Sequence, residues 1–390
     1  MFTATRTDAL ARLEAFVPAA GRAYAANRNH YPDTTSGLSP AIRRRLISEA
    51  EVADRALGAH SFSSCEKFVQ EICWRTYWVG WLEHRPVIWT RWLADVDRLT
   101  DALGADRSLQ RRYAEAVGAR TGIDCFDAWV TELAETGWLH NHARMNFASI
   151  WIFTLKLPWQ LGAELFYRQL LDACPASNTL SWRWVAGLQT AGKTYLARAD
   201  IIRSNSGGRF SVDAPLARAG EPLPRDDIPA PSALRRREHF DPALRTGHFV
   251  TTADLSLETQ SLPRIVAVGA TTRIGGDPAD LKRAFAETAL ADGLARAAAS
   301  AGCDADRLDE ENPVPAIREW AARHCLQQIV TAEAATGPVA DRLEVLASSL
   351  AADNIRLVRI RREWDAAAWP LATKGFFAFK VAIPKLLALA

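Results

Sequence analysis

The chain has no run of roughly 18 or more apolar residues, which excludes a membrane-spanning helix. It also lacks an excess of charge of one sign, because 47 Lys and Arg stand against 45 Asp and Glu, a net charge of +2. This balance excludes a strongly basic chain that coats nucleic acid without specificity, although a local basic patch is compatible with it. Charged residues at Asp8, Arg12 and Glu14 interrupt the stretch where a signal peptide would be apolar, so we expect a cytoplasmic protein.

Closely spaced cysteine ligands are missing as well. The six cysteines are dispersed without a CxxC pair, at Cys65, Cys73, Cys125, Cys174, Cys303 and Cys325. Metal centres and iron–sulfur clusters usually show tighter ligand spacing, so we interpret these residues as free thiols, mostly buried, and expect no metal site. His140 and His142 are two positions apart, which would put them on different faces of a helix and argues against a shared metal.

Tryptophan, by contrast, is abundant and unevenly distributed. The chain has 390 residues, enough for about two or three domains. Of its 14 tryptophans, 11 precede residue 185: Trp74, Trp78, Trp81, Trp89, Trp92, Trp129, Trp138, Trp151, Trp159, Trp182 and Trp184. Such large rings fill a helical core, and their concentration also suits stacking on a flat ligand or the conduction of electrons.

The N-terminal part of the chain is predicted to be helical. Apolar residues recur three and four positions apart in three segments, 64–84, 125–135 and 143–156. Almost no alternating strand pattern precedes residue 210. Prolines then gather among charged residues in 211–245, which indicates a surface linker.

Beyond the linker, strands are predicted to alternate with helices. Apolar runs predict strands at 264–270, 326–331 and 355–360. Helical segments are predicted at 279–301, 314–324 and 338–352. This alternation indicates a parallel sheet in a small Rossmann-like α/β domain at 246–390. The glycines after the first predicted strand lack the GxGxxG pattern, so they do not indicate a dinucleotide site.

Two segments of the helical part carry polar residues suited to a ligand site. Residues 35–40, TSGLSP, offer hydroxyl and backbone N–H groups ahead of a helix, a pattern that binds phosphate in some proteins and only caps the helix in most. Further on, one helix stripe mixes a carboxylate, a guanidinium and two indoles: Glu71, Trp74, Arg75 and Trp78. The stripe fits either a surface ion pair or the lining of a site.

A third segment, TGWLHNHARM at residues 136–145, places aromatic and polar side chains together. Trp138, Asn141 and Met145 share a helix face, and Arg144 adds a cation beside it. About thirty residues later comes Asp172, a carboxylate that could pair with Arg144. Polar residues this dense among indoles indicate a site rather than a core alone.

These segments together resemble the FAD-binding domain of the photolyase/cryptochrome family. The resemblance covers roughly residues 20–210 and rests on four motifs in the family's order: TSGLSP, EICWR, TGWLHNHARM and LLDACPASNTLSWRWVAG. It implies that residues 1–210 form an all-helical domain holding a U-shaped FAD in a pocket on its DNA-facing surface. The expected architecture is therefore multi-domain, with this α domain first, the Pro-rich linker at 211–245 and the α/β domain last.

The resemblance implies FAD contacts for the residues at matching positions. Those around the phosphates and ribityl chain would be Tyr24, Thr35, Ser36, Gly37, Leu38 and Ser39. Those lining the flavin would be Phe68, Arg75, Trp138, Asn141 and Arg144, with Asp172 pairing with Arg144. Asn178 would face the redox-active ring nitrogen, as in DNA-repairing members, and Cys174 stands near the flavin where the family has Asp.

Five residues match the family's pocket for a flipped cyclobutane pyrimidine dimer: Glu71, Trp74, Asn141, Met145 and Trp184. In the family an electron passes from the excited reduced flavin to the dimer, the ring splits and the electron returns. The carboxylate and the amide would hydrogen-bond the pyrimidine edges and stabilise the radical anion, while the indoles would stack on extruded bases. The expected function is light-driven repair of dimers in UV-damaged DNA by a monomer without a membrane partner.

Photoreduction of the flavin in this family usually needs a chain of tryptophans leading to the surface. Trp182 and Trp159 match its two inner members. The third is absent at its expected place near residue 106, and Trp92 and Tyr113 are the candidates to substitute for it.

Several departures from the family support an alternative function. The family normally begins with an α/β antenna domain, whereas here the flavin motifs start by residue 24 and the α/β sequence follows, which indicates a circular permutation. No antenna pigment is assigned to it. With Cys174 and the incomplete tryptophan chain, this arrangement favours a cryptochrome-like sensory or regulatory flavoprotein without repair activity. A degenerate member with a structural or DNA-binding role is a third hypothesis.

Overall fold

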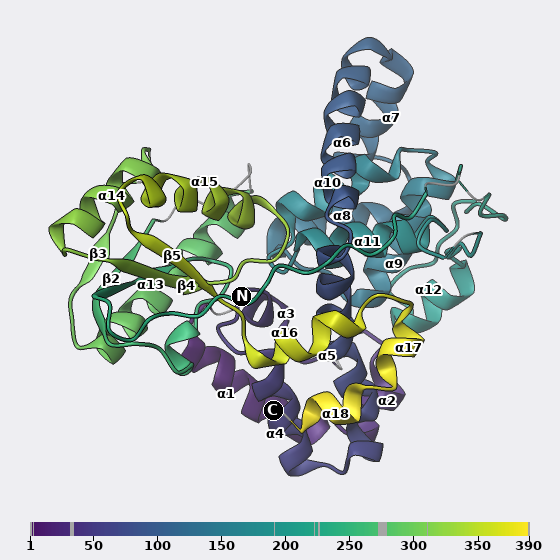
Figure 1. The fold of residues 1–390 in the computed structure, drawn as a ribbon. Coiled ribbons are helices and arrows are strands. Elements are labelled where there is room, and N and C mark those ends of the chain that lie inside the picture. Colours follow the sequence, from purple (N-terminus) through teal and green to yellow (C-terminus); the bar gives the residue numbers. More distant parts are fainter. Residues whose placement is uncertain are drawn as a thin grey trace. The chain divides into compact units, whose positions relative to one another are not determined.

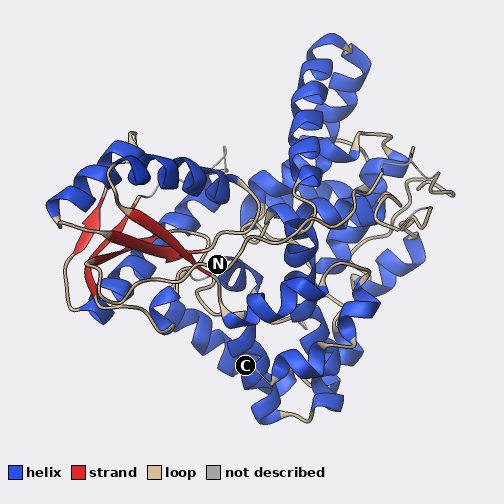
Figure 2. Ribbon diagram, in the orientation of Figure 1, coloured by secondary structure: helices blue, strands red, loops and turns tan. Residues whose placement is uncertain are grey.

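The computed structural model describes residues 2, 4–31, 35–190, 192–221, 223–224, 227–271, 279–309 and 311–388. The chain forms two compact units, whose elements are labelled in Figure 1 and coloured by type in Figure 2. The first unit contains Met1–Pro18, Ser36–His84 and Ser232–Ala390, and the second contains Ala19–Thr35 and Arg85–Pro231. The first unit is thus assembled from both ends of the sequence.

A five-stranded parallel sheet forms part of the first unit, with strand order β3-β2-β1-β4-β5. The strands are β1 Thr246–Val250, β2 Ile265–Ala270, β3 Ala305–Arg307, β4 Gln328–Ala332 and β5 Arg356–Ile360. Three helices follow β2, β3 and β4 along the chain: α13 Asp280–Ala301, α14 Pro313–Arg323 and α15 Pro338–Ala352. This is the doubly wound order, so the predicted Rossmann-like α/β class is confirmed.

Trp320 fills the hydrophobic core beside this sheet. Its side chain is fully buried, and its indole Nε1 donates a hydrogen bond to Asp306 Oδ2 at 2.9 Å. A Cβ at Gly247 would lie 2.8 Å from the ring, and a Cβ at Gly269 would lie 3.0 Å from it. The two neighbouring strands therefore accommodate the indole because each has a glycine beneath it.

The remaining helices of the first unit come from the two ends of the sequence: α1 Arg6–Phe16, α3 Ser39–Arg43, α4 Glu49–Ala59, α5 Phe62–Glu83, α16 Glu363–Ala368, α17 Phe376–Lys380 and α18 Ile383–Leu387. The C-terminal helices α16 and α17 pack against the long helix α5 (Figure 1). Trp364 Nε1 donates to Thr76 Oγ1 at 3.0 Å, and Tyr77 Oη donates to the carbonyl of Lys374 at 2.8 Å. Short helical turns complete the unit at Val17–Ala19, Leu257–Thr259 and Trp369–Leu371.

A cluster of buried charges joins these distant segments. Arg45 pairs with Glu49 at 3.4 Å and with Asp254 at 3.6 Å. Its third partner is Asp365, at 2.6 Å, and Arg362 extends the cluster by binding Asp254 at 2.6 Å. No more than 13% of any of these side chains is exposed. Because the charges are held out of water, each depends on the others for compensation.

Burial and charge act in opposite directions on the pKa values of this cluster. Burial alone would lower the pKa of Arg45, but the surrounding carboxylates outweigh it and raise that pKa well above its ordinary value. Burial likewise favours the neutral form of Glu49, yet the charges of Arg45 and Arg75 hold its pKa below the ordinary value. Arg45 also has a left-handed backbone, with φ 49°, which its ion pairs help to maintain.

All the regular secondary structure among the described residues of the second unit is helical, as predicted for the region before residue 210. Its helices are α2 Arg22–Asn27, α6 Val87–Ala105, α7 Arg107–Val117, α8 Asp124–Thr136, α9 Asn141–Ser149, α10 Trp159–Gln169, α11 Pro175–Val185 and α12 Ala199–Asn205. A π-helical turn, η2 Ile150–Thr154, follows α9 directly. The described residues between α12 and β1 contain no helix or strand.

The compact units do not coincide with the sequence division at residues 210 and 245. That division follows composition, whereas the units follow packing, and residues 36–84 pack with 232–390. The three-part division therefore stays a prediction about the sequence.

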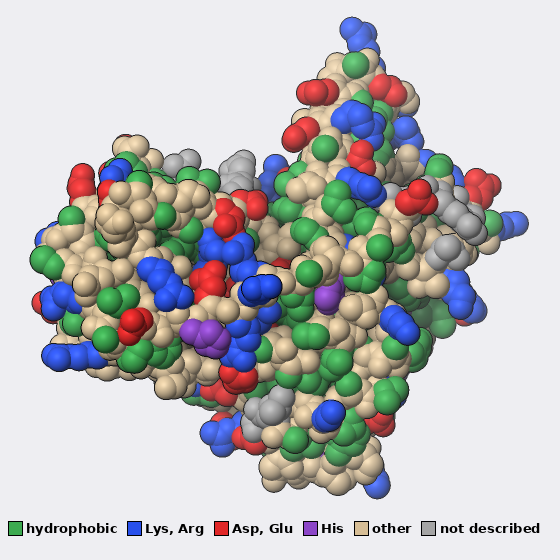
Figure 3. Space-filling view, in the orientation of Figure 1, with side chains coloured by type: hydrophobic (Ala, Val, Ile, Leu, Met, Phe, Trp, Pro, Cys, Tyr) green, Lys and Arg blue, Asp and Glu red, His purple; other side chains and the backbone are tan. Residues whose placement is uncertain are grey.

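Three surface and chemical properties of the described residues can be compared with the expectations. The six cysteines are free thiols, four of them buried, as predicted. Basic and acidic side chains are interspersed over the face drawn in Figure 3. Among the described residues, no helix is both long and apolar enough to cross a membrane.

We expect the substitution Arg45→Met to reduce the free energy of unfolding by about 3–5 kcal/mol, because it removes one partner of a buried ionic cluster. Urea unfolding followed by circular dichroism measures this. Arg55→Met is the matched control, since the Arg55 side chain is 56% exposed where it pairs with Glu14. The control should change the free energy by less than about 1 kcal/mol. Equal effects of the two substitutions would contradict a structural role for the cluster.

Candidate functional site

The predicted site residues are divided between the two units. Those in the first unit are Ser36, Gly37, Leu38, Ser39, Phe68, Glu71, Trp74 and Arg75. Those in the second are Tyr24, Thr35, Trp138, Asn141, Arg144, Met145, Trp159, Asp172, Cys174, Asn178, Trp182 and Trp184. Within each unit the structure shows which of them meet.

Arg144 and Asp172 form the ion pair that the sequence predicts. The guanidinium donates two hydrogen bonds to the carboxylate, Nη1 to Oδ1 at 3.0 Å and Nη2 to Oδ2 at 2.8 Å. Its Nε donates a third to the carbonyl of Leu139 at 2.8 Å. The same guanidinium lies 5.9 Å from the centre of the Trp138 ring. Three hydrogen bonds fix the orientation of the Arg144 guanidinium. This cation is therefore preorganised beside the indole of Trp138.

The backbone around Gly137 brings the two partners together. Gly137 ends α8 with φ 65°, and its carbonyl accepts a hydrogen bond from the backbone N–H of Leu171 at 2.9 Å. A Cβ at this glycine would lie 2.8 Å from the Leu171 side chain. The turn therefore joins the segment that begins at Trp138 to the one that contains Asp172.

Cys174 and Asn178 have defined local roles at the start of α11. The Cys174 sulfur accepts a hydrogen bond from the backbone N–H of Ser177 at 3.3 Å, so this buried cysteine caps the helix. Asn178 is also buried, and its Nδ2 donates to the carbonyl of Ala163 at 2.7 Å. That bond fixes the plane of the amide. The sequence analysis missed both contacts, and that of Asn178 depends on how α10 packs here.

A cation that the sequence analysis missed, Arg12, lies beside the predicted phosphate loop at residues 35–40. Arg12 on α1 donates through Nε to the carbonyl of Ser36 at 2.6 Å. Ser36 Oγ accepts from the backbone N–H of Leu38 at 3.3 Å, and Gly37 has φ 61°. The guanidinium occupies the space beside this glycine, where a Cβ would lie 2.1 Å from it. The loop therefore combines hydroxyls, an open backbone and a positive charge.

Arg75 and Phe68 are held by side chains from other elements of the first unit. Arg75 Nε donates to Glu49 at 3.2 Å, so the carboxylate that pairs with Arg45 also orients this predicted flavin residue. Phe68 is buried and its ring lies 5.2 Å from that of Phe16. Glu71 is partly buried on the same helix.

Trp74 is stacked against the C-terminal part of its own unit. Its ring and that of Phe376 have centroids 3.6 Å apart and planes at 11°. Phe376 begins α17, which lies along α5. One face of an indole predicted to receive an extruded base is thus covered by a phenylalanine. No sequence pattern reveals this contact, since Trp74 and Phe376 are about 300 positions apart.

The other residues predicted for the dimer pocket belong to the second unit. Asn141 and Met145 are neighbours one turn apart on α9, with Nδ2 and Sδ at 3.8 Å. Asn141 is exposed. Trp184 is partly buried and its ring centre lies 5.7 Å from that of Tyr195. Tyr24, a predicted cofactor residue, is buried on α2.

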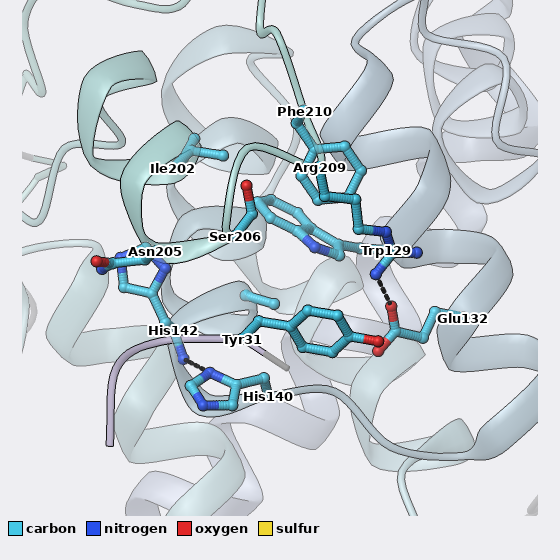
Figure 4. A pocket seen from close by; sticks show the side chains of 11 residues that line it. Tyr31, Trp129, Glu132, His140, His142, Ile202, Asn205, Ser206, Arg209 and Phe210 are labelled. Carbon is cyan, nitrogen blue, oxygen red and sulfur yellow. Dashed lines mark hydrogen bonds and ion pairs between the residues drawn. The ribbon is translucent and has the colours of Figure 1, made fainter. Parts of the chain in front are cut away.

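His140 and His142 face one small pocket, shown in Figure 4, so the expectation that their rings point to different faces was wrong. The reason is that His140 precedes α9 and caps it, with Nδ1 accepting from the N–H of His142 at 3.2 Å. Arg209 closes the same pocket by pairing with Glu132 at 3.0 Å and lying over the ring of Tyr31 at 5.4 Å. The pocket measures about 20 Å³, room for one water molecule.

The pKa of His142 is lowered to about 4, by burial first and then by the neighbouring His140 and His30. The His142 ring is therefore neutral at physiological pH. The backbone carbonyl of His142 accepts a hydrogen bond from Asn146 Nδ2 at 2.9 Å. Among the residues described, no group of three or more His, Cys, Asp or Glu side chains is arranged to hold a metal ion.

Comparisons with known proteins give one family for this part of the chain. The family model described as "FAD binding domain of DNA photolyase" matches residues 68–206. The chain is similar to the deoxyribodipyrimidine photo-lyase of Streptomyces griseus, 33% identical over 192 residues that cover 44% of this chain and 39% of that protein. It is also similar to the one of Thermus thermophilus, 35% identical over 195 residues that cover 48% and 44%. The matches thus span less than half the length of these curated relatives.

Among solved structures, a bacterial class III photolyase from Agrobacterium tumefaciens is similar with 28% identity and a TM-score of 0.44. That likeness covers 52% of this chain and 43% of the other.

We expect Asp172→Asn to lower the free energy of unfolding by about 1–3 kcal/mol, because it leaves the Arg144 guanidinium without its charged partner in a mostly buried place. Thermal unfolding of the full chain measures this. Asp200→Asn is the control, since Asp200 forms the same two-point contact with Arg198 where the pair is 59–66% exposed. A control that destabilises as much as Asp172→Asn would contradict the importance of burial at this pair.

Proposed function

We propose that this chain belongs to the photolyase/cryptochrome family through its FAD-binding domain and is a flavoprotein enzyme that repairs cyclobutane pyrimidine dimers in DNA under blue light. The observation that carries the proposal is the preorganised Arg144–Asp172 pair, with Asn178 fixed nearby on the same stretch of chain, inside the region that matches the family. The residue set of the dimer pocket, retained in the sequence, supports repair over other activities of the family.

The chemistry of the residues present fits an FAD molecule. A diphosphate needs hydroxyl and backbone donors with a positive charge, and the loop at Ser36–Ser39 offers these together with Arg12. A flat conjugated ring needs apolar and cationic surfaces of fixed orientation. Arg75 and Arg144 are each held by a carboxylate, which leaves their guanidinium planes oriented before a ligand arrives.

In this proposal, the resemblance to the family gives this chain's residues the following roles in repair. When bound, the reduced flavin supplies the electron that light transfers to the dimer. Glu71 and Asn141 would hydrogen-bond the pyrimidine edges and stabilise the negative charge that the dimer acquires. Trp74 and Trp184 would stack on the extruded bases, which lowers the cost of taking them out of the duplex. Asn178 would contact the flavin through an amide whose orientation Ala163 fixes.

We further propose that residues 246–390 correspond to the α/β antenna domain that precedes the FAD domain in the family. Their five parallel strands in doubly wound order support this correspondence. No antenna pigment is assigned to the sheet. UV-damaged DNA is the proposed partner.

The test of the enzyme proposal begins with the absorption spectrum of the purified protein, which should be that of a bound flavin. With the flavin chemically reduced, blue light should convert cyclobutane dimers in an oligonucleotide to pyrimidines. Glu71→Gln should lower the yield per absorbed photon several-fold while flavin content stays unchanged, because the carboxylate contacts the dimer and not the cofactor.

Glu66→Gln is the matched control for this experiment. It makes the same chemical change five residues earlier on α5, where Glu66 pairs with Lys380 at 3.1 Å and is 37% exposed. Its yield should equal that of the unaltered protein. A flavin-loaded, fully reduced protein that leaves dimers intact would overturn the repair proposal.

A second candidate function is a sensory or regulatory flavoprotein without repair activity, and the stack of Phe376 on Trp74 favours it. A base that needs this face of the indole must first displace the phenylalanine. The α17 segment would then respond to what binds near α5, as in a switch whose bistable element is a covered aromatic face.

The substitution Phe376→Ala distinguishes the two functions. If Phe376 blocks the indole, the variant should bind dimer-containing DNA more tightly than the unaltered protein in a fluorescence anisotropy titration. Phe377→Ala is the control on the same helix, because the Phe377 side chain is 84% exposed. Tighter binding by Phe376→Ala alone, together with a light-dependent change in the oligomer size of the unaltered protein, would favour the regulatory function. Unchanged affinity in both variants would remove the ground for it.

A further inference from the structure

A cavity of about 540 Å³ lies within the second unit, apart from the site described above. Its walls come from α6, α7, α10 and α11, from the turn that follows η2, and from Leu223 and Pro224 of the Pro-rich stretch. None of the described residues predicted for the flavin or the dimer lines it, although Trp159, indicated for electron transfer, does. Its volume lies within the range of roughly 300–1,000 Å³ that small-molecule sites occupy.

Two buried indoles form the aromatic part of the lining. Trp92 on α6 is 3% exposed, and Trp159, the first residue of α10, is 6% exposed. The Trp92 ring is supported by Trp89, with ring centroids 4.8 Å apart and planes at 29°. Among the described residues the Trp92 Nε1 has no hydrogen-bond partner. A buried donor left in this way costs about 1–3 kcal/mol, which an acceptor on a ligand would offset.

Positive charge outweighs negative charge in the same lining. The cationic side chains are those of Arg91, Arg112, Lys156 and Arg183. Arg183 is only 2% exposed, so its charge is almost wholly withdrawn from water. The carboxylates are those of Asp95 and Asp106, and Asp106 caps α7 by accepting two backbone N–H groups, at 2.8 and 3.1 Å. The excess of cations favours a ligand that carries negative charge.

One of these cations lies on a strained turn. Lys156 has a left-handed backbone with φ 53°, and it follows the π-helical turn η2 closely. Arg112 Nη1 donates to the carbonyls of Leu155 and Lys156, at 3.3 and 3.0 Å. Non-glycine residues persist in this conformation only where their surroundings hold them, and such residues cluster at ligand clamps. Arg112 therefore fixes the turn that carries the second cation.

A carboxylate and an amide complete the polar lining. Asp95 Oδ2 accepts a hydrogen bond from Gln160 Nε2 at 3.2 Å, so α6 and α10 present both groups together. Asp95 Oδ1 accepts from Arg98 at 2.8 Å. Carboxylate oxygens and an amide are suited to bind the hydroxyl groups of a sugar. The cavity thus combines surfaces for a flat ring, an anion and hydroxyls.

We propose that this cavity binds a free nucleoside monophosphate. The base lies against the indoles of Trp92 and Trp159, the phosphate meets the cations, and the sugar hydroxyls bond Asp95 and Gln160. The three parts of a nucleotide account for the three kinds of side chain in one lining. The proposal does not rest on the proposed function, because the residues predicted for the flavin and the dimer lie elsewhere.

The experiment is a calorimetric titration of the full chain, with any bound flavin retained, using AMP as the probe. AMP should bind at one site. Adenosine and inorganic phosphate should each bind at least tenfold more weakly, because each lacks one of the recognised parts. No heat of binding at millimolar AMP would overturn the proposal. Tighter binding of an oligoadenylate than of AMP would overturn it as well, because the ligand would then be a strand.

Lys156→Gln places the nucleotide in the cavity. This exposed side chain should be replaceable without loss of the fold, and its removal should weaken AMP binding about tenfold, the effect of losing one hydrogen bond to a charged group. Arg111→Gln is the matched control, since Arg111 is 75% exposed on α7 and does not line the cavity. Its affinity should equal that of the unaltered protein. Equal affinities of the two variants would overturn the proposal.

A second substitution separates the cavity from the predicted phosphate loop. Arg12 lies beside that loop, so AMP bound there should lose affinity in Arg12→Gln. A loss in Arg12→Gln with none in Lys156→Gln would overturn the proposal, as would release of bound flavin by AMP. A protein that lacks flavin yet binds AMP through Lys156 would overturn the enzyme proposal and leave this one standing. A flavin-loaded, dimer-repairing protein without AMP binding would do the reverse.

Discussion

The first unit depends on the compensation of charges that its own folding buries. Arg45 and Glu49 come from the N-terminal part of the sequence, Asp254 follows β1, and Asp365 lies on α16. Since an uncompensated charge in this interior costs several kcal/mol, these segments are stable only together. Glu49 also orients Arg75, so the interaction that holds the unit together is continuous with a predicted flavin contact. The Glu49 carboxylate thus contributes both to the stability of the unit and to the predicted site.

Much of the fold could be predicted from local patterns. The apolar runs of β2, β4 and β5 and the period of α13 and α15 gave element type and approximate bounds. Two strands were missed for identifiable reasons. β1 carries a buried His248 and a glycine beneath Trp320, so its sequence does not resemble an apolar run. β3 has three residues, mostly exposed, and is recognisable only by its pairing with β2.

The candidate site divides in the same way. The Arg144–Asp172 pair could be predicted because each of the two residues belongs to one of the sequence motifs. The contact of Asn178 with Ala163 could not, since it depends on how α10 and α11 pack. The helix-capping role of Cys174 is a local contact with Ser177 that the sequence analysis missed. The distribution of tryptophans likewise identified candidate residues for electron transfer but not which rings contact one another. The family pattern indicated Trp159, whereas Trp151, which the pattern did not indicate, has its ring centre 6.3 Å from that of Trp182.

The first unit combines segments from both sides of the Pro-rich stretch, which limits where this chain can be divided. Domain boundaries are usually placed where composition changes, which here would be the Pro-rich stretch after residue 210. A polypeptide ending there would keep the matched residues 68–206 but lose Asp254, Asp365 and Phe376. Arg45, Glu49 and one face of Trp74 would then meet water or a chaperone. Division of the chain at the linker would therefore separate side chains that compensate or cover one another in the first unit.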